Sequence, residues 1–321
     1  MGPVSTVPDL SVVVATRDRR ERLACLLGAL QEQTLPPERF EVIVVDDGSC
    51  DGTGQWLAGR LGRGSLCLRV IRRERPAGPA VARNEGWRDA RGALVAFTDD
   101  DCEPAPRWLE RLLVASADRE GHLLQGRTEP IPRERERIGI HSRTIASDTL
   151  GPWFQTCNVA YPREVLERLG GFDESFPSPG AEDTDLAWRA IEAGAPASYV
   201  PDALVHHAVN QLGALGQLRV ALRWTDASWV FGRHAGLRRE LHRGIFWKPS
   251  HERALLALLG LGLARRSPAA LVLLLPYYRE ARGRLAPLGG SRRDVPYLFV
   301  HDLVETAGAA RGALRYGVPV V

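Results

Sequence analysis

The sequence predicts an α/β fold built on a mainly parallel sheet flanked by helices. Over the first hundred residues, short apolar runs typical of buried strands alternate with segments whose apolar residues have helical spacing. Acidic residues come directly after two of these runs. Strands and helices that alternate at this spacing form βαβ units, in which neighbouring strands run parallel. We expect strands at residues 10–15, 41–45, 66–71 and 93–98, and helices at residues 19–33, 51–61 and 79–91.

Each element has a signature of its own. Residues 10–15 read Leu-Ser-Val-Val-Val-Ala, an apolar run of strand length. The first helix carries leucines at positions 23, 26, 27 and 30, which fall on one helical face. The third helix begins after a Gly-Pro turn at 78–79 and ends at Gly92. The last strand of the series leads directly into three consecutive aspartates.

The rest of the chain divides into three stretches. Residues 103–150 are less regular, and their charge run at 133–137 predicts a solvated segment. Residues 151–207 form a second patterned block that ends in an apolar stretch and a histidine pair. Residues 208–321 read as mainly helical. We therefore expect an α/β domain over 1–207, with halves at about 9–102 and 103–207, and a helical C-terminal region over 208–321.

Composition excludes several classes of protein. The chain has 321 residues and a net charge of +3, and the basic excess is too small to predict nucleic-acid binding. None of the five cysteines forms a C-x-x-C pair, which favours a reducing cytosol over a disulfide framework or a zinc site. The first ten residues lack the pattern of a signal peptide. No apolar run reaches the length of a membrane-spanning helix. We expect a cytoplasmic protein.

Three strand ends carry polar side chains, at 16–18, 46–47 and 99–101. In open α/β sheets, ligands bind beyond the carboxyl ends of the strands. The triplet at 99–101 is typical of a site where Mg²⁺ or Mn²⁺ joins carboxylates to substrate phosphates, although a solvated acidic turn has the same sequence. Asp46 and Asp47 are placed to accept hydrogen bonds from a nucleotide, and Asp-Gly-Ser is equally common turn chemistry.

Two further groups have both a functional and a structural interpretation. Arg83 lies one turn inside the helix that follows Gly78, where it could contact a phosphate or simply face solvent. Glu182 and Asp183 begin a helix that should stop at Gly194. Acids are favoured at a helix N-terminus by capping and by the dipole, and the same position suits a general base on a rigid element.

In this order and spacing, these segments resemble glycosyltransferase family 2, a large family of inverting enzymes built on the Rossmann-like GT-A fold. The resemblance covers roughly residues 9–207, about two thirds of the chain. It implies a nucleotide-diphosphate sugar donor, an acceptor that is a saccharide or lipid-linked, and Mn²⁺ or Mg²⁺ as cofactor. The matching segments are SVVVATRDR, VIVVDDGSCDGT, GPAVARNEGW, FTDDDCEP and GGFDESFPSPGAEDTDLAWR.

The resemblance also implies roles for individual residues. Asp183 would be the catalytic base, and Asp101 the principal metal ligand of the D-x-D. His207 matches a position where related enzymes place a metal-binding histidine, and His206 is the adjacent alternative. Asp47 would contact the nucleobase and Asp99 the ribose or the metal. The nucleotide-sugar site would comprise Thr16, Arg17, Asp46, Asp47, Arg83, Asp99, Asp100 and Glu182.

Two other activities remain to be separated from sugar transfer. A sugar nucleotidyltransferase would carry a Gly-rich loop with Lys after the first strand, but residues 15–20 contain neither. A catalytically inactive sugar-nucleotide-binding scaffold would be expected to lose the D-x-D or the base, and both are present. Processive relatives carry Gln-x-x-Arg-Trp, whereas this chain keeps Arg223-Trp224 and has Val220 in place of the Gln. A non-processive enzyme is therefore expected.

Residues 253–284 contain two apolar runs, 254–264 and 269–275, that are each too short to span a bilayer. One interpretation is a buried helical hairpin packed on the catalytic domain or on a second subunit of a homodimer. The other is a hairpin that touches the inner face of the plasma membrane, since many bacterial relatives act on lipid-linked or cell-envelope acceptors. The side chains expected to meet anionic lipid are Arg253, Arg265, Arg266, Arg279, Arg282, Arg284, Tyr277 and Tyr278.

Overall fold

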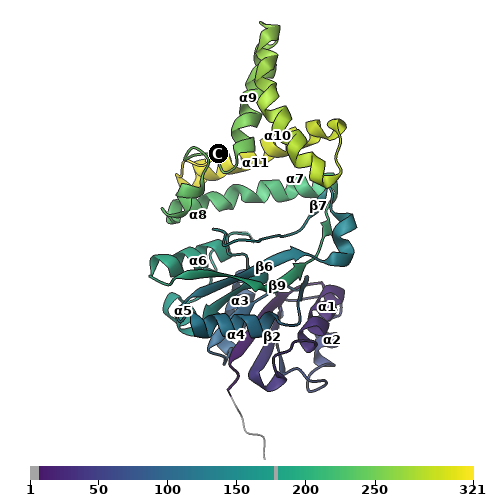
Figure 1. Cartoon of the computed structure of the whole chain (residues 1–321), viewed down its shortest axis with the longest axis vertical. Helices are drawn as coiled ribbons and strands as arrows, with labels where there is room; N and C mark the ends of the chain where they lie inside the picture. The colour runs from purple at the N-terminus through teal and green to yellow at the C-terminus, as the bar shows by residue number, and fades with distance from the viewer. Residues whose placement is uncertain (1–6, 177–179) are drawn as a thin grey trace, which may run out of the picture. The chain divides into compact units, whose positions relative to one another are not determined.

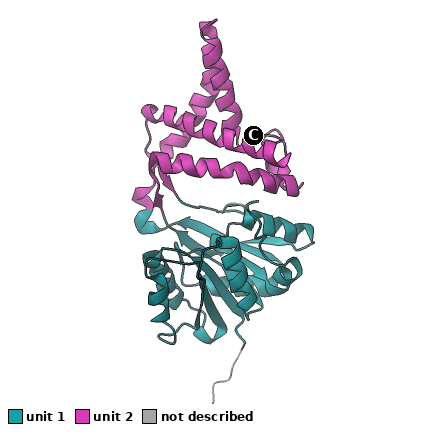
Figure 2. Cartoon of the chain, turned by 180° about the vertical axis from the view of Figure 1, so that it is seen from behind, with its two compact units in different colours: residues 1–134, 144–208 teal, residues 135–143, 209–321 magenta. Residues whose placement is uncertain are grey.

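The computed structural model describes residues 7–176 and 180–321. Residues 1–6 of the N-terminal stretch, and residues 177–179 of the fifth family segment, lie outside the described residues. The chain folds as two compact units, one of residues 1–134 and 144–208 and the other of residues 135–143 and 209–321 (Figure 2). The predicted catalytic domain ended at 207 and included 135–143, which here group with the second unit.

The first unit is built on an eight-stranded sheet in the order β3-β2-β1-β4-β8-β6-β9-β5. The first four strands are parallel, as are β6 and β9, whereas β8 and β5 run antiparallel to their neighbours. The α/β prediction is therefore confirmed. The strands are β1 Leu10–Thr16, β2 Phe40–Asp46, β3 Leu68–Arg72, β4 Leu94–Phe97, β5 Cys102–Pro104, β6 Leu123–Pro130, β8 Val159–Pro162 and β9 Ala197–His207.

Helices cover both faces of this sheet, because alternate strand residues point to opposite sides. Val12 and Val14 of β1 enter one core with the leucines of α1, whereas Val13 enters the other core with Trp87 of α3. Figure 1 shows the helices of this unit around the strands. They are α1 Arg20–Gln31, α2 Thr53–Ala58, α3 Pro79–Asp89, α4 Trp108–Asp118, α5 Arg163–Leu169 and α6 Glu182–Glu192, with 3₁₀ helices at Pro37–Arg39, Pro132–Arg137 and Thr156–Asn158.

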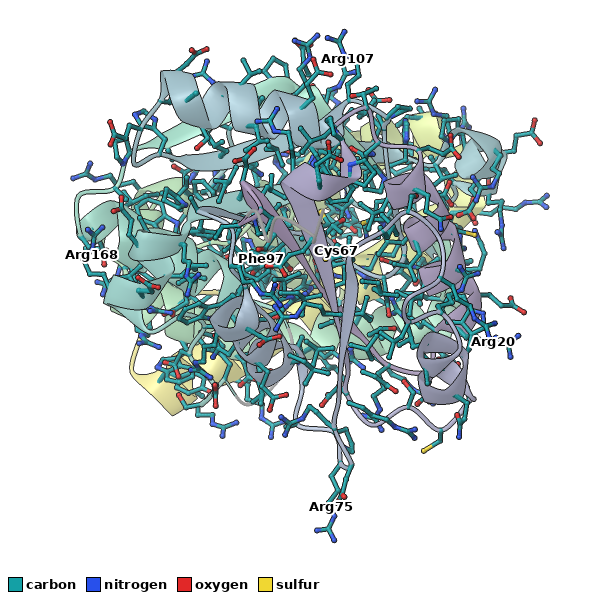
Figure 3. The ribbon with its side chains drawn as sticks, turned by 90° about the horizontal axis from the view of Figure 1, so that it is seen from below. Arg20, Cys67, Arg75, Phe97, Arg107 and Arg168 are labelled. Carbon is teal, nitrogen blue, oxygen red and sulfur yellow. The ribbon has the colours of Figure 1, made fainter. Side chains whose placement is uncertain are left out.

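Phe97 marks the centre of the second core, while Arg75, Arg107 and Arg168 project outward from the molecule (Figure 3). The Phe97 ring meets Tyr161 and Phe172 edge-to-face, with centroid separations of 6.0 and 5.1 Å. Such aromatic pairs stabilise the fold beyond what the burial of their apolar area contributes. Because Phe97 immediately precedes the acidic triplet, this packing fixes the end of β4 from which the triplet emerges.

The charge run at 133–137 departs from the prediction at one position. Four of its residues are exposed, as expected for a solvated segment, but Glu134 is buried. The carboxylate of Glu134 accepts hydrogen bonds from both terminal nitrogens of Arg22, on α1. A buried carboxylate needs such a partner, and the pairing explains why this one acid turns inward.

The second unit is helical apart from a short antiparallel pair, β7 and β10. The small residues Gly308 and Gly312 of its longest helix allow close packing, since a Cβ at Gly312 would lie 2.0 Å from the carbonyl oxygen of Thr225. No helix in the described ranges is long and apolar enough to cross a membrane. The elements are β7 Ser142–Arg143, β10 Asn210–Gln211, α7 Gly213–Arg223, α8 Ala227–Arg233, α9 Pro249–Leu263, α10 Leu275–Leu285 and α11 Val295–Tyr316, with 3₁₀ helices at Trp224–Asp226, Leu237–Glu240, Pro268–Leu274, Ala286–Leu288 and Arg292–Asp294.

Three side chains that were expected to meet lipid have hydrogen-bond or ion-pair partners inside the second unit. Arg253 forms an ion pair of 2.6 Å with Glu280. Arg284 donates two hydrogen bonds to Asp302, and the buried Tyr277 hydroxyl donates a third at 2.8 Å. The prediction that Tyr277 meets lipid was wrong, because the sequence does not show that Tyr277 is buried beside Asp302. The lipid contacts of the partly exposed Arg253 and Arg284 stay a prediction.

Candidate active site

The ends of three parallel strands meet at one edge of the sheet. Thr16 of β1 is in register with Asp46 of β2, and Val13 of β1 with Phe97 of β4. The chain then turns through Thr98 into the acidic triplet. The predicted convergence of polar groups at the carboxyl edge is therefore observed.

The acidic triplet is held by the loop that follows β1. The Thr16 hydroxyl donates to Asp100 Oδ2 at 2.8 Å. Arg19 Nη1 lies 3.0 Å from both Asp100 Oδ1 and Asp101 Oδ2. Asp100 and Asp101 are buried, whereas the Asp99 side chain keeps a quarter of its surface exposed. Burial raises the pKa of Asp100 to about 6, although the Arg19 guanidinium lowers it.

His207 and Asp101 form the group best suited to a divalent cation. His207 Nε2 lies 3.5 Å from Asp101 Oδ1, and His207 Nδ1 lies 2.8 Å from the carbonyl oxygen of Ala208. A metal-binding histidine characteristically donates its other ring N–H to such an oxygen, which leaves the remaining nitrogen as a ligand. The Cys102 thiol, directly across from His207 on β5, is within 4.8 Å of both groups.

The adjacent histidine occupies a different environment. His206 pairs in register with Glu103 on β5 and is only partly buried, whereas His207 is buried. Successive residues of a strand face opposite sides of the sheet, so His206 cannot share the face on which His207 lies. Of the two predicted alternatives, the geometry favours His207 as the metal ligand.

A second cluster of potential ligands, His301, Asp302 and Glu305 on α11, is already occupied by cationic side chains. Arg284 pairs with Asp302 at 2.6 Å, and Lys248 pairs with Glu305 at 2.7 Å. These ion pairs neutralise the carboxylates that a metal would need. The cluster is therefore a structural network within the second unit.

Arg83 joins the acidic triplet to the predicted catalytic helix. This buried side chain donates from Nη2 to Asp99 at 2.8 Å and from Nη1 to Glu182 at 2.9 Å. Glu182 Oε2 also accepts from the backbone N–H groups of Gly180 and Ala181. Arg83 and these two amides hold the pKa of Glu182 below its usual range despite burial. The phosphate contact predicted for Arg83 stays a prediction.

Asp183 differs from Glu182 in how its carboxylate is bonded. The Thr184 backbone N–H donates to Oδ1 at 2.8 Å, and no residue among those described donates to Oδ2. Burial, followed by the negative charge of Glu182, raises the pKa of Asp183 well above its ordinary value. A partly exposed carboxylate with a free oxygen and a raised pKa has the properties of a general base.

Asn84 of α3 anchors the turn at Gly171 and Phe172, which lies between α5 and α6. Asn84 Oδ1 accepts from the Phe172 N–H and from Trp87 Nε1, both at 2.8 Å, and its Nδ2 donates to the Phe172 carbonyl oxygen. Gly171 has φ +81°, and a Cβ there would lie 2.3 Å from Asn84 Oδ1. Only glycine fits this close approach, which explains the second Gly of the Gly-Gly-Phe-Asp segment.

The remaining predicted residues lie at the same edge with other partners. Both oxygens of Asp47 accept from the backbone N–H groups of Ala77 and Gly78, at 2.9 and 2.8 Å. Asp46 Oδ1 caps the Ser49 N–H, whereas its buried Oδ2 has no hydrogen-bond partner in the described residues. Arg17 is exposed, and its Nε lies 3.6 Å from Asp18 Oδ2. The nucleotide contacts predicted for these residues are not tested by this arrangement.

Two residues that the sequence reasoning did not select also contact the triplet. Arg19 lies between Asp100 and Asp101, and the Thr156 hydroxyl lies 3.5 Å from Asp99 Oδ1. The signal for Arg19 was the run of arginines that opens α1 beside the Thr16 segment. No local pattern marks Thr156, which reaches the site from a 3₁₀ helix 57 positions further along the chain.

Comparison with known proteins agrees with this geometry. The model of the glycosyl transferase family 2 matches residues 11–172, half of the chain. This match, together with the sheet and its acidic edge, defines a glycosyltransferase. The chain belongs to the glycosyl transferase family 2, and its fold is GT-A.

Characterised relatives are similar over about two thirds of the chain. Glycosyltransferase AglE of Haloferax volcanii is 28% identical over 66% of this chain and 70% of its own length. Validoxylamine A glucosyltransferase of Streptomyces hygroscopicus subsp. limoneus is 33% identical over 61% of this chain. The match spans only half of the latter enzyme's length.

Solved structures extend the likeness to nearly the whole chain. Mannosyltransferase PcManGT from Pyrobaculum calidifontis, in complex with GDP-Man and Mn²⁺, is 25% identical with a TM-score of 0.58. The alignment covers 97% of this chain and 87% of that one. TarS of S. aureus, residues 1–349 with UDP, gives a TM-score of 0.55 at 18% identity and supports the fold alone.

Proposed function

We propose that this chain transfers a sugar from a nucleotide-diphosphate sugar to an acceptor hydroxyl, in a single inverting displacement that depends on Mn²⁺ or Mg²⁺. The observation that carries the proposal is the bridge made by Arg83 between Asp99 and Glu182. Through Arg83, Asp99 of the acidic triplet is linked to Glu182, the residue next to the proposed base Asp183, although 84 positions separate Asp99 from Asp183 in the sequence.

The residues present fit a divalent cation. Asp101 and His207 would hold it, and the Ala208 carbonyl oxygen fixes the ring of His207 for that role. When bound, the cation supplies positive charge that offsets the charge developing on the diphosphate leaving group. The PcManGT structure contains Mn²⁺, which supports the same cofactor type here.

The donor nucleotide would lie along the ends of β1, β2 and β4. In this proposal, Asp47 contacts the nucleobase, with Asp46 beside it, and Asp99 contacts the ribose. Thr16 and Asp100 line the bottom of the nucleotide site. Arg17, which follows β1 directly and is exposed, would contact the donor from the solvent side. Asp46 Oδ2 lies 3.8 Å from Arg72 Nε but accepts no hydrogen bond from the described residues, which supports a polar contact with the donor, since a buried oxygen without a hydrogen bond is costly.

Asp183 would remove the proton from the acceptor hydroxyl as that oxygen attacks the anomeric carbon. Its Oδ2 is available for the proton, while Thr184 holds Oδ1 in place. The neighbouring Glu182 keeps its charge through Arg83, and this charge favours proton uptake by Asp183. One displacement on the face opposite the nucleotide inverts the anomeric centre.

We further propose a non-processive enzyme of the cytoplasm that acts on saccharide or lipid-linked acceptors of the bacterial cell envelope. Val220 stands in place of the glutamine of processive relatives. Nucleotide sugars are cytosolic substrates, and all five cysteines carry free thiols, which suits a reducing compartment. Acceptor selection would fall to residues 130–157 and the C-terminal third, since acceptor sites in such folds are built from variable loops.

A thermal-shift screen tests donor and metal together. Only a ligand that binds the native state raises stability, by about 2.7 kcal/mol at a hundred times Kd. We expect one of UDP-, GDP- and dTDP-sugars to raise the unfolding temperature by several degrees with Mn²⁺, and far less with EDTA. A protein that no nucleotide sugar stabilises, with or without metal, would contradict the proposal.

A further inference from the structure

The two apolar runs of residues 253–284 form a tight helical hairpin within the second unit, and Figure 1 shows its tip pointing away from α7, α8 and α11. The contact between α9 and the 3₁₀ helix Pro268–Leu274 is made by small residues. Gly260 is buried there, and a Cβ on it would lie 2.8 Å from the Ala270 carbonyl oxygen. Ala254 and Ala257 are buried in the cluster that includes Tyr277 and Ala281 of α10. Because the small side chains occupy the contact, the large ones are left outside.

Six leucines of α9 are exposed, each with between 36% and 53% of its surface accessible. At 100° per residue they cover roughly 220° of the helix circumference. A helix packed on one protein partner presents an apolar stripe of about 100°, so a single partner would leave many of these leucines in water. The six are Leu255, Leu256, Leu258, Leu259, Leu261 and Leu263.

The other arm of the hairpin also exposes apolar side chains. Leu271, Val272, Leu275 and Tyr278 are exposed on it, with Val272 the most accessible at 61%. Exposed apolar patches of this extent mark interaction surfaces in soluble proteins. Tyr278 adds a hydroxyl to an apolar ring, the combination enriched where lipid headgroups meet acyl chains.

The charges of the segment have one sign. No acidic residue lies between Arg253 and Glu280. Arg265 and Arg266 are exposed at the turn between the two arms, and Arg279 is exposed near its base. Residues 254–279 therefore offer guanidinium groups beside apolar side chains and no carboxylate of their own, and the nearby Glu280 is already paired with Arg253.

We propose that residues 254–279 bind the surface of an anionic phospholipid bilayer. The leucines enter the outer acyl region while Arg265, Arg266 and Arg279 remain at the lipid phosphates. The arm α9 is about 22 Å long, shorter than the roughly 30 Å hydrocarbon core, and the arginine pair at its end would be costly at the bilayer centre. The hairpin therefore lies in the interface. This proposal does not depend on the transfer chemistry.

Cosedimentation of the full chain with phosphatidylglycerol–phosphatidylcholine vesicles tests the proposal. We expect the protein to pellet with these vesicles at low salt, and to bind at least tenfold more weakly at high salt or to vesicles of phosphatidylcholine alone. The double variants Leu258→Ser/Leu259→Ser and Arg265→Glu/Arg266→Glu should each lose binding by about tenfold or more. Both pairs are exposed, so unfolding temperatures should stay near that of the wild type.

The control is Leu314→Ser, which removes an 89% exposed leucine on α11 and should leave vesicle binding unchanged. Protein that stays in the supernatant at low salt with phosphatidylglycerol would overturn the proposal. A second result would also overturn it: the wild type forms a stable dimer by light scattering and does not bind vesicles, whereas the Leu258→Ser/Leu259→Ser variant is a monomer. Equal binding to neutral and anionic vesicles would overturn the role given to the arginines.

Discussion

The guanidinium of Arg19 lies 3.0 Å from Asp101 Oδ2, on the carboxylate that we assign to the metal. The same nitrogen lies 3.0 Å from Asp100, so one cation neutralises two buried acids. A divalent cation at Asp101 would have to share or displace this contact. Arg19 is therefore expected to weaken metal binding in the absence of donor.

We expect Arg19→Met to tighten Mn²⁺ binding to the free protein by roughly fivefold to tenfold, because a positive charge is removed from beside the site. Electron paramagnetic resonance of free Mn²⁺ measures the dissociation constant directly. The control is Arg20→Met, since the neighbouring Arg20 side chain projects outward (Figure 3). Unchanged or weaker Mn²⁺ binding in Arg19→Met would show that Arg19 does not compete with the metal.

Asp101→Asn should abolish Mn²⁺ binding and reduce transfer to near background. A site with few protein ligands that loses its principal carboxylate leaves the phosphates uncompensated. The exposed Asp202, on β9, provides a matched Asp202→Asn control that should retain both properties. If Asp101→Asn kept normal turnover and the same Mn²⁺ dependence, Asp101 would not be the ligand.

Asp183→Asn should lower the transfer rate about a hundredfold or more, the usual scale for a general base, and leave donor affinity unchanged. Isothermal titration with the donor and a steady-state rate assay separate the two effects. The control is Glu192→Gln, at the far end of the same helix, which should behave like the wild type. Donor affinity that falls in parallel with the rate would make Asp183 a structural cap.

The raised pKa of Asp183 also predicts a pH profile. A base works only when ionised, so the rate should fall on acidification, with a midpoint above that of an ordinary aspartate. The same fall should be absent from the residual rate of Asp183→Asn. A wild-type rate that stays level down to the pKa of a free aspartate would contradict the assignment.

Asn84→Ala should destabilise the fold by about 3 kcal/mol, since it leaves buried partners on Phe172 and Trp87 without a hydrogen bond. The unfolding transition of the first unit in urea measures this loss of unfolding free energy. Arg88→Ala on the same helix removes an exposed ion pair with Glu174 and a cation–π contact with the Trp87 ring, and should cost about 1 kcal/mol or less. If the two substitutions lowered the free energy of unfolding equally, Asn84 would not anchor the turn.

The strands and their acidic ends could be predicted from sequence because both signals are local. The apolar runs predicted β1, β2 and β4, and aspartates stand at the end of β2 and just after β4. The bridge from Arg83 to Glu182 could not be predicted, because it spans 99 positions and depends on how α3 packs beside α6. Likewise, the sequence shows the leucines of 254–263 but not that Gly260 brings the two arms together and turns the leucines outward.

The most direct test of the central claim is the identity of the products. With a donor that the thermal-shift screen selects and Mg²⁺, ³¹P NMR should show the nucleoside diphosphate, and early ¹H NMR spectra should show a sugar product of inverted anomeric configuration. Asp101→Asn should release both products at near-background rates, and Asp183→Asn should release them about a hundredfold or more slowly than the wild type. Pyrophosphate release, or a product of retained configuration, would contradict metal-dependent inverting sugar transfer by this chain.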